Sequence, residues 1–391
     1  MSQIEEDKPP RVFLLDPRAL VETRRRLCLG EPDLLVADDR LLQDAGQILD
    51  VGPFSVVEKE SLPPSGDKCD YMSLEPYWWP NEGAADGMPY IYRSDKVNQN
   101  ADQHDRMALS AMCSAVNTLA LAYYFSDHEL FAAHAALLLR TWFLDETTGM
   151  NPHLQYGHGI PGRCDGKYSG IIETLPFSWL VDAVGLLGAS PSWTSNDQED
   201  LESWFSHYLS WLLDSVFGLE QARQPDHQGI WYDVQVASSA LFTGRADLAH
   251  RVLSGAFADR IGRQIQRDGR LTLEPIKSHA LEYCTMSLVG LFDLAILGER
   301  VGLDLWHCAT GDGRSIKTAF YWFVECVQDK REWPSEQIES FDQSQLLPLL
   351  RRGGIKYQDP SCEERIKALE GIDWEADRTN LLYPKERIEK C

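Results

Sequence analysis

Three side chains of the kinds that move protons or hold anions lie within the stretch LEPIKSHALEY, residues 273–283. They are Lys277, His279 and Tyr283. If a helix begins after Pro275, His279 and Tyr283 lie four residues apart and share one face. An imidazole and a phenol on one face can transfer protons, with a lysine as a nearby cation. A solvated helix end explains the same polar residues equally well.

A second candidate is the polar turn in QPDHQGIWYDVQ, where His227 and Gln228 come directly before a helix expected to begin near Trp231. A histidine beside a helix start can act as a base, or as a hydrogen-bond donor to an anion that develops during a reaction. As an isolated motif this turn is a weak signal.

A third cluster is aromatic and spans YMSLEPYWWPNEG and the residues that follow it. Pro76 and Pro80 bracket three large rings, and proline lacks a backbone donor and restricts its neighbour, so we expect no regular structure here. Flat rings suit the faces of sugars, and amides suit sugar hydroxyls. The candidates for sugar binding are Tyr77, Trp78, Trp79, Asn100 and His104. The alternative is that both tryptophans only fill space in the fold.

The fourth cluster is the glycine-rich stretch MNPHLQYGHGIPGRCDGKYSG. Two histidines and two cations in one loop favour a place for a carboxylate. The residues concerned are His153, Tyr156, His158, Arg163 and Lys167. A single histidine in such a loop is more often a structural group, so this interpretation stays open as well.

Several classes of function are disfavoured by composition. The formal net charge of -23 disfavours a nucleic-acid partner, because phosphate contacts need a basic stripe. No H-E-x-x-H metal motif, no serine-esterase motif and no P-loop is present. The nine scattered cysteines contain no C-x-x-C pair, which argues for reduced thiols. We expect a cytosolic protein with no membrane partner, since no signal peptide or apolar span is recognised.

Helices must position these clusters, because apolar residues recur at spacings of three and four. The pattern is clear in residues 112–123, 131–142, 201–211, 234–241 and 288–295. Strict alternation typical of strands is scarce. We therefore predict an all-α fold, an incomplete (α/α) toroid or barrel of helical hairpins with long loops at one end.

Domain organisation is simple, because no internal stretch resembles a linker. Residues 1–391 are expected to form a single domain, with a charged tail from about 355 to 391 wrapping the surface. The long irregular stretches, residues 51–104, 145–173 and 219–231, carry the candidate chemistry, as long loops in compact domains usually do.

The ordered set of clusters resembles the alginate lyase superfamily, the polysaccharide lyases with an (α/α) toroid that include alginate and glucuronan lyases. The segments that carry the resemblance are YMSLEPYWWPN, LRTWFLDETTGMNPHLQYGHGIPG and GIWYDVQVA. It implies β-elimination on a uronic acid: the C5 carboxylate is neutralised, the C5 proton is removed and the bond to O4 breaks. No cofactor is required.

The resemblance also assigns roles residue by residue. Tyr283 matches the family's tyrosine, which acts as base, acid or both, and Lys277 stands where the family usually has an arginine for the carboxylate. An unmodified tyrosine has a pKa of about 10, so Tyr283 is expected to need a cation such as Lys277, or a nearby His, to act as a base near neutral pH. The family reads Asn-Asn-His-Gly where this chain has PDHQG, so His227 or Gln228 takes the histidine's place, depending on one inserted residue. Cys69 stands where relatives commonly have histidine.

Three hypotheses for function follow. The first is a lyase that cleaves a uronate-containing polymer or oligosaccharide, of alginate or glucuronan type. The second is a repurposed toroid that performs elimination, dehydration or cyclisation on a small intracellular metabolite, and it predicts a closed pocket. The third is a non-catalytic protein that binds oligouronates, in which Gln228 has replaced an essential histidine. The partner in each case is an anionic carbohydrate or small acidic molecule, and the oligomeric state is unknown.

Overall fold

The computed structural model describes residues 9–93, 96–98, 104–272, 280–328 and 341–385. Within these ranges helices dominate, which confirms the predicted fold class. The α-helices are α1 (Pro17–Cys28), α2 (Pro32–Ile48), α3 (Asp105–Ser126), α4 (Glu129–Leu139), α5 (Phe177–Leu186), α6 (Ser195–Asp214), α7 (Val216–Ala222), α8 (His227–Phe242), α9 (Ala246–Ala256), α10 (Gly262–Gln264), α11 (Ala280–Arg300), α12 (Ile316–Val327), α13 (Leu346–Tyr357), α14 (Ser361–Lys367) and α15 (Thr379–Leu382). Shorter 3-10 or π turns are η1 (Val56–Glu58), η3 (Arg140–Leu144), η4 (Tyr168–Thr174), η5 (Phe257–Ile261) and η6 (Gln343–Gln345).

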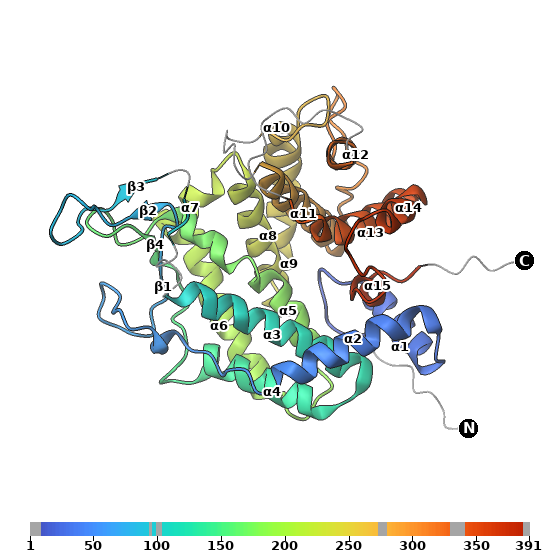
Figure 1. Ribbon diagram of the computed structural model, residues 1–391, viewed down its shortest axis with the longest axis horizontal. Helices are drawn as coiled ribbons and strands as arrows, with labels where there is room; N and C mark the ends of the chain where they lie inside the picture. The colour runs from blue at the N-terminus through green and yellow to red at the C-terminus, as the bar shows by residue number, and fades with distance from the viewer. Residues whose placement is uncertain (1–8, 94–95, 99–103, 273–279, 329–340, 386–391) are drawn as a thin grey trace, which may run out of the picture.

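The helices pack in a ring (Figure 1). Helices α3, α5, α8 and α11 follow one another around it, each in contact with the next. Outer helices pack against them as hairpin partners: α4 against α3, α9 against α8 and α12 against α11. The segment FSDHEL joins α3 and α4 in one such hairpin, and Asp127 turns the chain there with a left-handed φ of 57°. Successive helical hairpins therefore make the scaffold.

The ring helices are long and apolar because they are covered on several sides. In α8, every residue from Gly229 to Ala240 is buried, and Trp231 is 1% exposed. Helices α3 and α11 are long and apolar enough to cross a membrane by length and composition, but most of each apolar window is buried inside the fold. Burial of this kind is typical of the core helices of a globular domain.

Loops and short strands lie at one end of the ring, on the left in Figure 1. Strand β1 (Met72–Leu74) pairs in parallel with β4 (Tyr156–Gly159), and β2 (Trp78–Trp79) pairs antiparallel with β3 (Ile91–Tyr92). The first pair ties the aromatic stretch to the glycine-rich stretch, although some eighty residues separate them in the sequence. Two of the predicted functional loops are thus held side by side.

The C-terminal helices complete the ring, which differs from the expected surface tail. Helix α13 contacts α11 and α15, and α15 contacts α1 and α2. Leu381 is 0% exposed, and its carbonyl oxygen accepts a hydrogen bond of 2.8 Å from the Thr23 hydroxyl. Part of the segment after residue 355 is therefore buried in the core, because its apolar side chains fill the gap between α11 and the N-terminal helices.

Candidate active site

The ends of two ring helices bring His227 and Tyr283 together. Their ring centroids are 4.8 Å apart and the rings are tilted by 39°. His227 is the first residue of α8, which is capped by Asp226: its Oδ1 accepts the Gln228 backbone N–H at 2.9 Å. Tyr283 lies in the first turn of α11. The fold therefore joins two clusters that lie more than fifty residues apart in the sequence.

The surroundings set the protonation states of this pair. Burial raises the pKa of the Tyr283 phenol, and the hydrogen-bonded Tyr77 beside it raises that pKa further. Burial lowers the pKa of His227, and the nearby Asp226 only partly offsets this. Near neutral pH the phenol is therefore protonated and the imidazole is neutral.

The expectation that a cation such as Lys277, or a nearby His, lowers the pKa of Tyr283 stays a prediction. Among the described residues, burial and the acidic neighbours Glu282 and Glu75 act in the opposite direction. Lys277 and His279, the other members of that cluster, lie outside the described residues.

Gln228 follows His227 in the first turn of α8. Its carbonyl oxygen accepts a hydrogen bond of 3.3 Å from the Gln221 side chain. Its own side-chain Oε1 is buried and has no hydrogen-bond partner among the described residues. A buried polar atom without a partner calls for an explanation, and a bound ligand is one. Of the two residues in this turn, His227 is the one whose ring contacts Tyr283.

The turn before α8 is fixed by a residue that the sequence did not single out, Arg260. Its guanidinium pairs with Asp233 at 2.7 Å and donates to the carbonyl oxygens of Ala222 and Gln224 at 2.7 and 2.9 Å. Gly229 lets these groups approach, because a Cβ there would lie 2.2 Å from the Gln224 oxygen. No local motif marks Arg260, since its partner Asp233 lies 27 residues earlier.

The aromatic stretch is not irregular, which corrects the prediction: strands β2 and β3 and the loop between them, residues 78–92, form a flap. Trp78 pairs with Tyr92 and Trp79 with Ile91 across β2 and β3. The two prolines limit this strand to two residues but do not prevent it, because the ladder needs no donor from either proline. The Arg163 guanidinium lies over the Trp78 ring, 4.8 Å from its centroid.

In the glycine-rich stretch, internal acids pair with three of the four basic side chains that were predicted to hold a carboxylate: His153 with Asp70, and His158 and Lys167 with Glu75. His158 is buried, with Nδ1 3.2 Å from Glu75 and Nε2 3.3 Å from Glu173. Burial lowers the pKa of His158, but the two carboxylates outweigh it and raise the pKa to about 9. Burial raises the pKa of Glu75, but His158 and Lys167 together lower it to about 2.

The remaining candidates are dispersed around this cluster. His153 pairs with Asp70 at 3.0 Å, and its ring lies 6.3 Å from that of Tyr156. His104 precedes α3, and burial lowers its pKa while its Nδ1 has no hydrogen-bond partner in the described ranges. Asn100 lies outside the described residues.

Cys69, the third departure from the family pattern, is half-buried near the same loop. Its backbone N–H donates to Asp67 at 2.9 Å, and burial raises the pKa of its thiol. The thiol is therefore protonated near neutral pH. Within the described ranges no group of His, Cys, Asp and Glu side chains could hold a metal ion.

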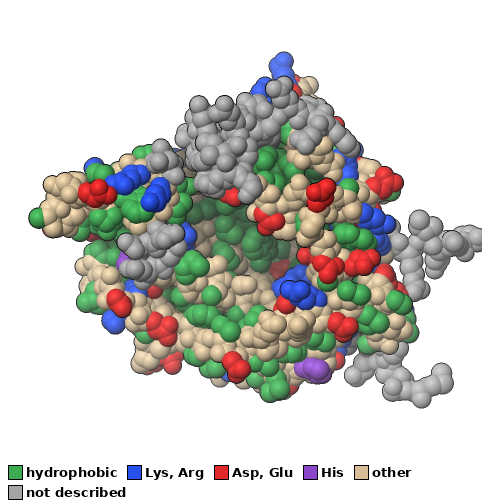
Figure 2. Space-filling view, in the orientation of Figure 1, with side chains coloured by type: hydrophobic (Ala, Val, Ile, Leu, Met, Phe, Trp, Pro, Cys, Tyr) green, Lys and Arg blue, Asp and Glu red, His purple; other side chains and the backbone are tan. Residues whose placement is uncertain are grey.

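A cavity of 740 Å³ lies inside the ring, and its lining begins within one helical turn of the His227–Tyr283 pair, although neither residue of the pair lines it. Trp231 on α8 and Met286 on α11 line it, each about one helical turn from the pair. In Figure 2 the hollow has a largely hydrophobic floor, between the flap and the C-terminal helices. A pocket of this size is in the range for ligand sites, about 300–1,000 Å³.

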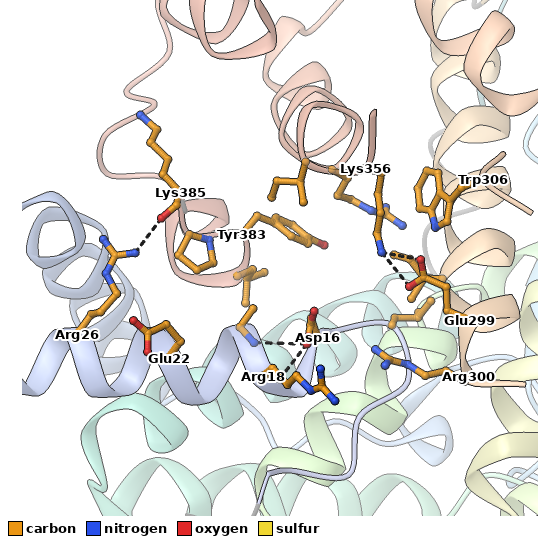
Figure 3. Close-up of a pocket in the computed structure, with 17 residues that line it drawn as sticks. Asp16, Arg18, Glu22, Arg26, Glu299, Arg300, Trp306, Lys356, Tyr383 and Lys385 are labelled. Carbon is orange, nitrogen blue, oxygen red and sulfur yellow. Dashed lines mark hydrogen bonds and ion pairs between the residues drawn. The ribbon is translucent and has the colours of Figure 1, made fainter. Parts of the chain in front are cut away.

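A second cavity, of 530 Å³, lies on the other side of the C-terminal segment and differs in character (Figure 3). Its charged side chains are mostly paired with protein groups. Lys356 binds Glu299 at 2.6 Å, and Arg300 donates to the carbonyl oxygens of Phe13 and Leu15. Its lining on α11 lies at the opposite end of that helix from Tyr283, at Ile296, Glu299 and Arg300, and no residue of α8 lines it. This cavity is therefore a poor candidate for the reaction.

Comparisons with known proteins agree with the fold and the family resemblance. The family model for alginate lyase matches residues 55–333. The crystal structure of an alginate lyase from Bacteroides ovatus is 33% identical, with a TM-score of 0.90, over 96% of this chain and 100% of that one. A search of curated proteins gives no match.

More distant structures share the fold alone. Alginate lyase A1-III from Sphingomonas species A1 is 13% identical, with a TM-score of 0.57 over 90% of this chain and 99% of that one. A variant of alginate lyase A1-III complexed with a tetrasaccharide is 14% identical, with a TM-score of 0.62 over 99% and 100%. Taken with the family-model match and the 33% identical structure, the chain belongs to the alginate lyase family of polysaccharide lyases, which are carbon–oxygen lyases.

Proposed function

We propose that this protein cleaves a uronate polymer of alginate or glucuronan type by β-elimination at the His227–Tyr283 pair. The observation that carries the proposal is the contact between these two rings, 4.8 Å apart, beside a ligand-sized cavity. The opposite shifts of their pKa values support a division of roles, because a neutral imidazole can accept a proton that a protonated phenol cannot.

In this mechanism His227 removes the C5 proton of the uronate. The electron pair of the broken C5–H bond forms the C4–C5 double bond, and the C4–O4 bond breaks. Tyr283 donates its proton to the departing O4. The imidazolium and the phenolate left behind are neighbours, so transfer of one proton between them, directly or through water, restores both groups. Lys277 remains the predicted partner of the substrate carboxylate.

The contact between the rings also favours one class of uronate. Rings this close leave no room for a sugar between them, so both must act from the same side of the substrate. In mannuronate and glucuronate the C5 hydrogen and O4 lie on one side of the sugar ring, whereas in guluronate they lie on opposite sides. We therefore expect polymannuronate or glucuronan, rather than polyguluronate, to be the better substrate.

The other two hypotheses receive less support. An enzyme for a small metabolite predicts a closed pocket, but the hollow opens to the surface in Figure 2. A non-catalytic binding protein was suggested by Gln228 in place of a histidine, but His227 lies beside the phenol. The family membership also favours a polysaccharide lyase over both alternatives.

The experiment is a panel of polymannuronate, polyguluronate and glucuronan, assayed by the ultraviolet absorbance of the unsaturated product. We expect absorbance to rise with polymannuronate or glucuronan and to rise much more slowly with polyguluronate. No increase with any of the three would refute the proposed function. A faster reaction with polyguluronate would refute the one-sided geometry while leaving the reaction class intact.

A further inference from the structure

The wall of the 740 Å³ cavity that faces α5 and α8 comes largely from the C-terminal segment. Gln345, Pro348, Arg352, Arg378, Leu382 and Tyr383 line the cavity. All of them lie beyond residue 333, where the match to the family model ends. The match to the family model therefore includes the reacting pair but ends before this wall.

One side of the cavity suits the apolar face of a sugar. The Trp179 ring is half-buried and lines the cavity, and its Nε1 donates to Asp293 at 3.1 Å. Trp231 packs against it edge to face, with ring centroids 5.5 Å apart. The hydrogen bond and this packing hold the Trp179 ring in place, so it presents a fixed flat surface.

The lining of the cavity also includes the cation Arg378, which makes one hydrogen bond and one long ion pair with the protein. Arg378 lies at the start of α15 with its side chain 35% exposed. It donates to the Thr118 hydroxyl at 3.0 Å, and its distance to the Asp44 carboxylate is 3.6 Å. A guanidinium has five N–H donors in a planar fork that matches a carboxylate. Arg378 can thus bind a further carboxylate without losing its contact with α3.

A protein wall separates this cavity from the 530 Å³ cavity and limits the length of ligand that it can hold. Arg352, Leu382 and Tyr383 line both this cavity and the 530 Å³ cavity, so they form the wall between the two. Arg352 is 7% exposed and pairs with the buried Asp293. A wall anchored in this way leaves room for a few sugars rather than a long chain.

We propose that this cavity is a sugar-binding site for the part of the uronate chain that lies across the reacting pair from the aromatic flap. In it, Arg378 binds a uronate carboxylate and Trp179 packs against a sugar ring. The inference rests on the proposed function and adds a residue of the C-terminal segment to substrate recognition.

The test measures kcat and KM for Arg378→Gln on uronate oligosaccharides of increasing, defined length. We expect KM to rise about tenfold on the longer oligosaccharides, which is the usual effect of losing a hydrogen bond to a charged group. On the shortest oligosaccharide that is cleaved we expect no change in KM, because it does not reach Arg378. The value of kcat should stay within about twofold, since Arg378 touches no reacting atom.

Two further variants separate binding from folding. Arg378→Lys keeps the charge and should restore part of the affinity. Arg263→Gln removes an exposed arginine of α10 that does not line the cavity, and it should leave kcat and KM unchanged. A lower kcat with an unchanged KM in Arg378→Gln would show a merely structural role and overturn the inference, as would wild-type constants at every length. If the wild-type protein cleaves no uronate at all, the proposed function fails instead.

Discussion

The sharpest test of the reaction is Tyr283→Phe, because it removes one hydroxyl and keeps the ring. Phenylalanine retains the packing against His227, 4.8 Å between centroids, so the ends of α8 and α11 should stay in place. What is lost is the only proton donor in the pair near neutral pH, since the surroundings raise the pKa of the Tyr283 phenol. The variant therefore separates the chemistry from the scaffold.

The expected loss in kcat is large compared with the expected loss in stability. A positioned general acid contributes about 10²–10⁴-fold in rate, which is about 3–5 kcal/mol of activation free energy. Loss of the hydroxyl removes one hydrogen bond, to Tyr77, and should cost about 1 kcal/mol of unfolding free energy. Activity should therefore fall by two to four orders of magnitude (about 10²–10⁴-fold) in a protein that remains folded.

The assay is the initial rate of product absorbance on polymannuronate and glucuronan, with thermal unfolding measured on the same samples. Tyr321→Phe is the matched control, because Tyr321 on α12 also donates one hydrogen bond, to Asp359 at 2.9 Å, outside the site. It should lose similar stability and no activity. If Tyr283→Phe keeps kcat within about threefold of the wild type, the phenol is not the acid and the assignment is wrong.

Three other results are expected. The acidic limb of the kcat/KM profile should have its midpoint below about pH 6.5, because burial lowers the pKa of His227. The alkaline limb should begin only above about pH 10, because the pKa of Tyr283 is raised. His158→Gln should remove the contribution of the protonated imidazole to the free energy of unfolding. The pKa of His158 is about 9 in the folded protein and about 6.5 in the unfolded chain, so this contribution is complete below pH 6.5 and is lost as the pH rises towards 9. Gly229→Ala should lower kcat more than about tenfold, because the new Cβ would lie 2.2 Å from a backbone oxygen and shift the turn that carries His227.

Each of these has a result that contradicts it. A rising limb of kcat/KM above pH 7 would mean that His227 is not the base. Equal slopes of unfolding free energy against pH in the wild type and His158→Gln, measured in denaturant from pH 6 to 9, would mean that the buried histidine gains no proton affinity on folding. Wild-type kcat in Gly229→Ala would show that the turn tolerates displacement. The matched control is Gly46→Ala on α2, where nothing lies within 4 Å of the new Cβ and, as at Gly229, φ is not positive.

Much of the scaffold could be predicted because helical periodicity is a local property. The apolar stripes of α3 and α4 identify both helices and the hairpin between them. The two-residue strands of the flap could not be predicted in the same way, because each residue pairs with a partner 12 or 14 residues away. Short strands carry too few residues for an alternating pattern to be recognised.

The residue types of the site could be predicted from the sequence, but the ion pairs that some of them form could not. His227 and Tyr283 were both candidates, and the fold brings their rings into contact. The use of His158 by Glu75 and Glu173 could not be inferred, because the two acids lie on different segments and meet the histidine only through tertiary packing. Arg260 was missed for the same reason: its role is to hold a turn formed by residues far earlier in the chain.

The contact between α1 and α15 has a consequence for how the protein assembles during synthesis. The Thr23 hydroxyl and the Leu381 carbonyl oxygen that it binds are 358 residues apart. At about 5–20 residues per second, the ribosome needs roughly 20–70 s to pass from one to the other. During that interval the inner faces of α1 and α2 lack this partner, and the nascent chain carries apolar surface that chaperones recognise. The N-terminal helices are thus made early but reach their final packing late.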